Sequence, residues 1–136
     1  MQRTLNILLV EDDEVDVLLV KRAFAEARVT NTLDVVSDGI AALAYLRSPD
    51  TRNDRRIVLL DLNMPRMSGL EFLRELRADE QLKHTTVIVM TTSNEDKDRI
   101  EAYDLNVSGY VVKPLTFAAF AETVAALNKY WTLMEL

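Results

Sequence analysis

Five side chains that could do chemistry together each follow an apolar run of the sequence. They are the carboxylates of Glu11, Asp12 and Asp61, the hydroxyl of Thr91 and the ammonium of Lys113. Three carboxylates brought together repel one another unless a cation lies between them, and oxygen ligands favour a hard cation, Mg²⁺ before Ca²⁺. Mg²⁺ keeps several waters and accepts phosphate oxygens, so such a site suits a phosphoryl group.

The expected chemistry is attack of an ionised carboxylate oxygen of Asp61 on phosphorus, which gives an acyl phosphate. Lys113 and the cation would spread the charge on the transferring oxygens, and Thr91 could donate to one of them. An ionised carboxylate needs no general base to attack phosphorus. The reaction is therefore compatible with a chain that has a single histidine. His84 lies in a polar turn, and we interpret it as a surface residue rather than a metal ligand.

Asp61 alone would not justify this hypothesis. It ends the apolar run 57–60, which is typical of a buried strand, and a lone aspartate at a strand end is more often a cap or a loop anchor. A carboxylate at that edge of an open α/β sheet is, however, held rigidly and presented to ligands. The hypothesis therefore depends on the other four side chains meeting Asp61.

The spacing of apolar residues predicts the fold that would bring them together. Runs typical of strands begin near residues 5, 32, 57, 86 and 109, and a helical pattern follows each. One helix between successive strands is what right-handed βαβ connections require, so we expect an α/β fold with a parallel sheet and helices on both faces. The carboxyl ends of the strands, with all five side chains, then share one edge. The expected helices are 15–27, 39–46, 69–76, 96–103 and 116–131. The residues 93–96 are expected to form a capped start to the fourth of these helices. The polar stretch 48–56 is an expected exposed loop.

Length and composition limit the possible functions. The 136 residues predict one domain over 1–136, ending in a short apolar tail from about 131 to 136. The net charge of −6, without a basic block, argues against nucleic-acid binding. No cysteine is present, which excludes disulfides and thiolate metal sites. No apolar run approaches the ~18 residues of a membrane span, so a cytoplasmic protein without membrane contact is expected.

Four segments resemble the signature segments of the receiver domain of two-component response regulators. They are ILLVEDD at 7–13, LLDLNMP at 59–65, VMTT at 89–92 and GYVVKP at 109–114. The resemblance covers nearly the whole chain and implies a flavodoxin-like (βα)5 fold with five parallel strands in the order 2-1-3-4-5. It also implies transfer of a phosphoryl group from a phosphohistidine of a sensor histidine kinase to Asp61, followed by slow autodephosphorylation that the chain itself catalyses.

The resemblance also implies roles for single residues. Mg²⁺ would bind through Glu11, Asp12, Asp61 and the backbone carbonyl of Asn63. Thr91 and Tyr110 would rearrange as a switch on phosphorylation, and the Lys113–Pro114 peptide would be cis. Asp13 falls one position past the acidic pair of the family, and we interpret it as exposed or outside the ligand set. Thr92, where many receivers carry Ala or Gly, could narrow access to Asp61, and Asn63 and Ser93 occupy positions that tune hydrolysis in the family.

Weaker features resemble the small single-domain response regulators that accompany bacterial phytochromes. They are DGIAALAYLR at 38–47, TTS at 91–93, YDL at 103–105 and the Tyr130-Trp131 pair near the end. This resemblance implies a bacteriophytochrome-type kinase as donor and a homodimer. The apolar residues around Trp131 favour a dimer contact through the last helix and the tail, with packing inside the monomer as the alternative.

Three alternative functions are weighed against a phosphorylated receiver that signals through protein contacts. A flavin-binding protein would need phosphate donors after the first strand, where this chain has the acidic run 11–14. A phosphatase with an aspartyl nucleophile would need an acid two residues after Asp61, where Asn63 stands. A receiver-like scaffold or dimerisation module that is never phosphorylated remains open, although the presence of Asp61, Thr91 and Lys113 disfavours it.

Overall fold

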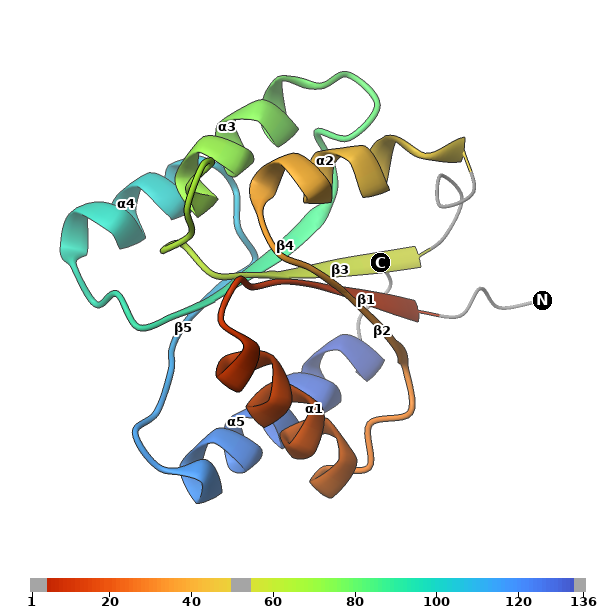
Figure 1. The fold of residues 1–136 in the computed structure, drawn as a ribbon, viewed down its shortest axis with the longest axis vertical. Coiled ribbons are helices and arrows are strands. Elements are labelled where there is room, and N and C mark those ends of the chain that lie inside the picture. Colours follow the sequence, from red (N-terminus) through yellow and green to blue (C-terminus); the bar gives the residue numbers. More distant parts are fainter. Residues whose placement is uncertain (1–4, 50–54, 134–136) are drawn as a thin grey trace.

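The computed structural model describes residues 5–49 and 55–133, in which five strands alternate with five α-helices (Figure 1). All strands are parallel, in the order β2-β1-β3-β4-β5. The expected flavodoxin-like fold is therefore confirmed. The strands are β1 (Leu5–Val10), β2 (Thr32–Val36), β3 (Arg55–Leu60), β4 (Thr86–Thr91) and β5 (Gly109–Val112), and the helices are α1 (Glu14–Glu26), α2 (Gly39–Arg47), α3 (Gly69–Ala78), α4 (Asp96–Asp104) and α5 (Phe117–Leu133).

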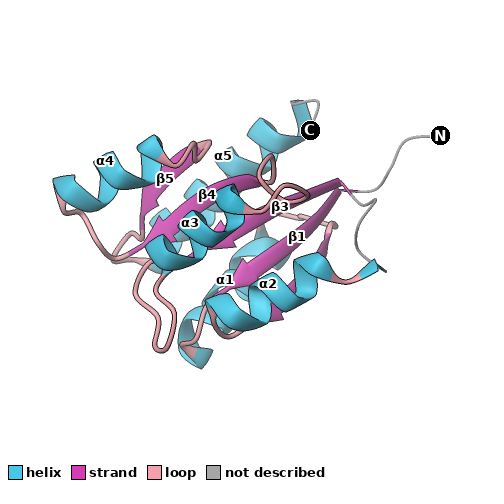
Figure 2. Cartoon of the chain, turned by 90° about the horizontal axis from the view of Figure 1, so that it is seen from above, coloured by secondary structure: helices cyan, strands magenta, loops and turns pink. Residues whose placement is uncertain are grey.

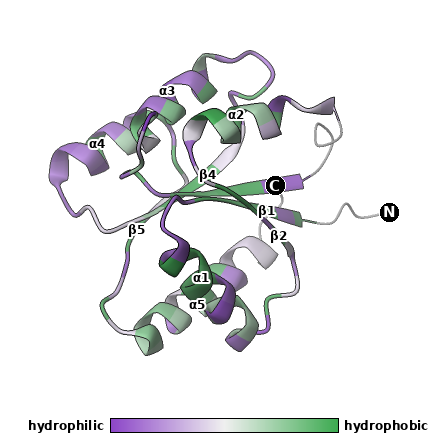
Figure 3. Cartoon of the chain, in the orientation of Figure 1, coloured by the Kyte–Doolittle hydropathy of each residue, from purple (hydrophilic) through white to green (hydrophobic). Residues whose placement is uncertain are grey.

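Helices cover both faces of the sheet, with α1 and α5 on one side and α2, α3 and α4 on the other (Figures 1 and 2). The side chains of the central strands alternate between the two faces, as strand geometry requires. In β3, Val58 and Leu60 pack toward α2 and α3, whereas Ile57 and Leu59 pack toward α1 and α5. Figure 3 shows hydrophobic residues along the central strands and a mixture of hydrophobic and hydrophilic residues in the helices on either side. These two buried layers hold the strand ends rigidly.

The third strand begins earlier than the sequence pattern indicates. Arg55 and Arg56 pair with Leu5 and Asn6 of β1, so the exposed loop expected over 48–56 ends before them. The reason is that backbone ladder bonds do not require apolar side chains, and these two residues lie at the entry end of the strand. Residues 50–54 of that expected loop lie outside the described part of the chain.

The last helix is longer than expected and buries the residue that we assigned to an exposed tail. α5 continues to Leu133, and Trp131 is only 1% exposed. Its ring lies 6.1 Å from that of Phe24 on α1, measured between centroids. Trp131 therefore packs inside the monomer, which is the alternative left open above. Leu133 is 84% exposed, and residues 134–136 of the expected tail lie outside the described residues.

Two further expectations fail. The Lys113–Pro114 peptide is trans, since no cis peptide bond occurs among the described residues. The expected capped start of α4 is wrong in its detail, because the helix begins at Asp96 without a side-chain cap and Ser93 bonds to Asp98 instead. Among residues 5–49 and 55–133 no helix has the length and apolar character needed to cross a membrane.

Candidate active site

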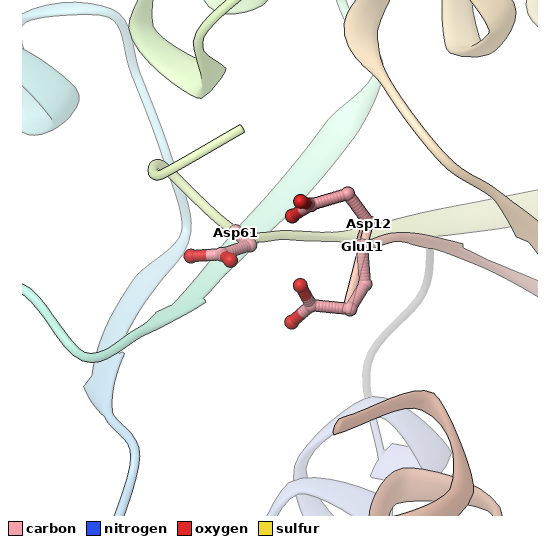
Figure 4. Close-up of side chains that lie close together, drawn as sticks. All are labelled: Glu11, Asp12 and Asp61. Carbon is pink, nitrogen blue, oxygen red and sulfur yellow. The ribbon is translucent and has the colours of Figure 1, made fainter. Parts of the chain in front are cut away.

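Three carboxylates meet at the carboxyl edge of the sheet. Glu11 and Asp12 follow β1, and Asp61 follows β3, the neighbouring strand. One ligand oxygen from each lies within 4.8 Å of the others. Figure 4 shows the side chains of Glu11 and Asp12 extending from the end of β1 on the side of Asp61. Glu11 and Asp61 are buried, at 2% and 7% exposed, whereas Asp12 is exposed.

Backbone hydrogen bonds fix Asp61 at this edge. Its N–H donates to the carbonyl of Val10 over 3.1 Å, which extends the β1–β3 ladder by one residue beyond the strand. The N–H of Asn63 donates to Asp61 Oδ1 over 3.2 Å, so the following loop turns around the carboxylate. The loop closes where Gly69 donates to the carbonyl of Leu62 over 3.0 Å. Hydrogen bonds of the strand before Asp61 and of the loop after it therefore fix the position of this residue.

The loop between Asp61 and α3 is also attached to α2. Arg66, at a left-handed φ of 65°, places its guanidinium 2.6 Å from a carboxylate oxygen of Asp38. Asp38 is buried and caps α2 by accepting from the N–H of Ala41 over 2.8 Å. Ser68 and Glu71 form a capping box that starts α3. The capping signals thus determine where the helices begin and, through them, where the loop lies.

Thr91, the last residue of β4, is fully buried, and its hydroxyl donates to Asp61 Oδ1 over 2.9 Å. A buried hydroxyl with a carboxylate partner satisfies both groups and holds Oδ1 toward β4. Oδ1 therefore accepts from both Thr91 and Asn63. The second oxygen, Oδ2, is the one on the side of Lys113.

Lys113, just after β5, is anchored by its own backbone and by carboxylates. Its N–H donates to the carbonyl of Thr91 over 2.7 Å. Its Nζ donates to Glu11 Oε1 over 2.5 Å and to Asp16 Oδ2 over 2.9 Å, and it lies 3.9 Å from Asp61 Oδ2. The gap to Asp61 is too long for a hydrogen bond but short enough for charge attraction.

Burial and charge shift the pKa of the two central groups. Burial disfavours the ionised form of Glu11 and raises its pKa to about 7, although Lys113 opposes the shift. Burial also works against the ammonium of Lys113, but the hydrogen bonds that it donates to Glu11 and Asp16 outweigh this effect and raise the pKa of Lys113. Lys113 is therefore a cation throughout the neutral range, as binding to an anionic group requires.

The donor set fits a hard divalent cation. All three side chains offer carboxylate oxygens, which Mg²⁺ prefers, and three close negative charges need a positive charge between them. Lys113 supplies one unit of positive charge, which leaves the pocket with an excess of negative charge. The fourth expected ligand, the carbonyl of Asn63, belongs to a residue that is exposed and adjoins the pocket through its N–H. Its role as a ligand stays a prediction.

The residues expected to act as a switch lie along one chain of hydrogen bonds. The N–H of Ser93 donates to Thr91 Oγ1 over 3.3 Å, and the hydroxyl of Tyr110 donates to the carbonyl of Ser93 over 2.9 Å. Ser93 Oγ in turn donates to Asp98, in the first turn of α4, over 2.6 Å. Tyr110 is therefore connected to Asp61 through hydrogen bonds of Ser93 and Thr91. Burial raises the pKa of Tyr110.

Two acidic residues have structural roles that the sequence did not assign. Asp13 caps α1 by accepting from the N–H groups of Val15 and Asp16, and it is exposed as expected. Asp16 holds Lys113, a contact that joins residues 97 positions apart. The signal for Asp13 was present, since an aspartate just before an apolar-periodic segment is a typical helix cap. No pattern of residue spacing indicates the contact that Asp16 makes.

Comparisons with known proteins agree with this geometry. Residues 7–125 match the response regulator receiver domain family. The chain is 40% identical over 127 residues to the probable methanogenesis regulatory protein FilR2 of Methanothrix harundinacea, covering 92% of this chain and 82% of that protein. It is 34% identical over 128 residues to the response regulator Rcp1 of Synechocystis, covering 92% of this chain and 87% of Rcp1.

Solved structures give the same result. The Mn²⁺-bound form of Rcp1 matches with a TM-score of 0.82 at 32% identity, covering 98% of this chain and 97% of that one. The phosphorylated cyanobacterial phytochrome response regulator RcpA matches with a TM-score of 0.85 at 33% identity, covering 99% and 98%. The similarity extends over nearly the full length of both chains in each pair.

Proposed function

This chain belongs to the response regulator receiver domain family, and from that membership we propose that it accepts a phosphoryl group on Asp61 in a site that also binds Mg²⁺. Receiver domains act in two-component systems, and phosphorylation and Mg²⁺ binding are general to them. The observation that carries the proposal is the meeting of Asp61 with two further carboxylates and with Lys113, 3.9 Å from Asp61 Oδ2.

The proposed reaction forms one bond and breaks one. Asp61 Oδ2 attacks phosphorus, and the bond between phosphorus and the imidazole nitrogen of the donor phosphohistidine breaks, so that the imidazole leaves with the electron pair. Lys113 and Thr91 place positive charge and a hydroxyl donor around the transferring oxygens. Glu11, Asp12 and Asp61 would hold Mg²⁺, which would neutralise part of the charge on the transferring oxygens.

The donor we propose is a sensor histidine kinase of the bacteriophytochrome type. Support for this class comes from the similarity to RcpA, a cyanobacterial phytochrome response regulator. The proposed output is a change in protein contacts, since phosphorylation adds roughly two negative charges beside Thr91 and α4.

The proposed organisation is a single receiver domain over residues 1–136 that acts in the cytoplasm.

Labelling of the wild-type protein with a small phosphodonor tests the proposal. Incubation with acetyl phosphate and Mg²⁺ should give one phosphate-sized adduct by intact mass, and peptide mapping should place it on Asp61. The adduct should be lost in hydroxylamine, as acyl phosphates are, and labelling should fall at least tenfold in EDTA. A chain that stays unlabelled with both acetyl phosphate and a histidine kinase would instead be the unphosphorylated scaffold weighed above.

A homodimer through α5 is a second proposal, supported by apolar surface that the monomer does not cover. Leu133 is 84% exposed and Tyr130 is 39% exposed near the end of α5. Sedimentation equilibrium should show a wild-type dimer at micromolar concentration and a Leu133→Glu monomer. The fold should be unaffected because Leu133 lies outside the core. Wild type that sediments as a monomer, or an unchanged dimer in the variant, would contradict a contact through this helix.

A further inference from the structure

Asp16 is the carboxylate beside the active site that the proposed reaction does not use. It lies in the first turn of α1, and its Oδ2 accepts from Lys113 Nζ over 2.9 Å. Its side chain is 31% exposed, whereas that of Lys113 is 9% exposed. Asp16 is not one of the three carboxylates whose oxygens lie within 4.8 Å of one another. Its contact is thus with the ammonium and not with the proposed cation site.

Lys113 has three N–H donors, and two of them are directed to Glu11 and Asp16. Lys113 Nζ also lies 3.9 Å from Asp61 Oδ2. That separation leaves room for an oxygen of a phosphoryl group on Asp61 without any retreat of the ammonium. A lysine side chain has much rotamer freedom, so two fixed partners are what keep this donor in place.

Glu11 lies between two cationic partners, Lys113 and the proposed cation. It belongs to the carboxylate group that fits a divalent cation, and it also accepts from Lys113. A cation held by that group would share the negative charge of Glu11 with the ammonium and would weaken the hold of Glu11 on Lys113. We propose that Asp16 is a positioning residue that keeps Lys113 beside Asp61 under those conditions. This inference rests on the proposed function, because it concerns the lysine that contacts the transferring phosphoryl group.

A simpler reading treats Asp16 as one of the acids that stabilise the start of a helix. Glu14 and Asp16 both lie in the first turn of α1, where negative charge interacts favourably with the helix dipole. Glu14 therefore provides the matched control, because Glu14→Gln removes the same charge from the same turn and Glu14 is exposed. The simpler reading predicts the same result for Glu14→Gln and Asp16→Asn.

Loss of negative charge and loss of the Lys113 anchor predict opposite changes in the labelling rate of Asp16→Asn. Acetyl phosphate is an anion, so removal of a carboxylate near the pocket should speed its reaction if repulsion alone matters. Loss of the anchor should slow it, because a poorly placed Lys113 stabilises the transferring oxygens less. We expect Asp16→Asn to be labelled about fivefold more slowly than wild type with acetyl phosphate and Mg²⁺. Glu14→Gln should be labelled at the wild-type rate or slightly faster.

A second measurement does not depend on phosphorylation. In ¹⁵N spectra recorded with Mg²⁺, the Lys113 ammonium should be protected from solvent exchange in wild type and in Glu14→Gln, and its signal should broaden or vanish in Asp16→Asn. Lys113→Met, which lacks the ammonium, assigns the signal. The inference is overturned if Asp16→Asn keeps the protected signal, or if it is labelled as fast as Glu14→Gln. If wild type is never labelled but the signal depends on Asp16, the proposed function fails and the anchoring stands.

Discussion

Asp61→Asn should abolish labelling by acetyl phosphate and yet leave a protein that, in EDTA, is more stable than wild type. The amide has no ionised oxygen for attack on phosphorus, so the adduct should fall below detection. Asp104→Asn is the matched control, since Asp104 is an exposed aspartate at the end of α4, and its labelling should equal that of wild type. An adduct of equal size on Asp61→Asn would reject Asp61 as the acceptor.

The expected gain in stability follows from the charges around Asp61. Its carboxylate lies near those of Glu11 and Asp12 and attracts only Lys113, at 3.9 Å. At a pH above 7, where Glu11 is ionised, replacement by Asn removes two repulsions and one attraction. The amide oxygen can still accept from Thr91 and from the N–H of Asn63. We expect a gain of about 1 kcal/mol in the free energy of unfolding at low salt without divalent cations.

Mg²⁺ should reverse this order of stability, because a ligand that binds only the folded protein stabilises it by RT ln(1 + L/Kd), where L is the free ligand concentration. Wild type, with three carboxylates, should gain more than the variant, with two. Urea denaturation of both proteins in EDTA and in millimolar Mg²⁺ measures the change of order. A loss of stability in EDTA would mean that the attraction between Asp61 and Lys113 outweighs the repulsion.

The constellation at the strand edge was predictable because each member follows its own apolar run. Predicting their proximity required only the positions of four strand ends and the rule that the carboxyl ends of parallel strands share an edge. This holds for Glu11, Asp61, Thr91 and Lys113. The strand that carries Asp61 began two residues earlier than the pattern suggested. That error did not matter for the site, because the site lies at the other end of the strand.

What could not be predicted depends on which surfaces meet in three dimensions. The apolar stripe of α5 is equally suited to a partner or to its own core, and only the packing of Trp131 against Phe24 decides for that residue. The contact of Asp16 with Lys113 spans 97 residues and requires α1 and the end of β5 to be placed together. The trans Lys113–Pro114 peptide contradicts an expectation that came from the family rather than from these residues.

Gly69 shows how closely the loop that carries Asp61 is packed. A Cβ at this position would lie 2.5 Å from the carbonyl oxygen of Asp61 and 2.6 Å from Cα of Leu62. Both are backbone atoms, which cannot turn aside as the end of a flexible side chain can. No described glycine has a positive φ, so the constraint is one of space rather than of backbone conformation. The start of α3 can approach the Asp61 strand this closely only without a side chain.

Gly69→Ala should therefore lower the free energy of unfolding by about 3 kcal/mol, because either α3 or the Asp61 loop must move apart. The displacement should also slow labelling of the folded variant by about tenfold, since Asp61 would shift relative to Lys113. Gly109→Ala is the matched control. Its Cβ would meet only Ile88 Cγ2, at the ordinary contact distance of 3.7 Å.

Urea denaturation followed by far-ultraviolet circular dichroism measures the first effect, and acetyl phosphate labelling under conditions where the variant is fully folded measures the second. Gly109→Ala should lie within about 1 kcal/mol of wild type, because alanine is no worse than glycine in a strand. Equal stability of Gly69→Ala and Gly109→Ala would show that α3 can move away from β3 without cost. In that case the position of Asp61 would be set by the β1–β3 ladder and Thr91 alone, and the labelling rate should stay at the wild-type value.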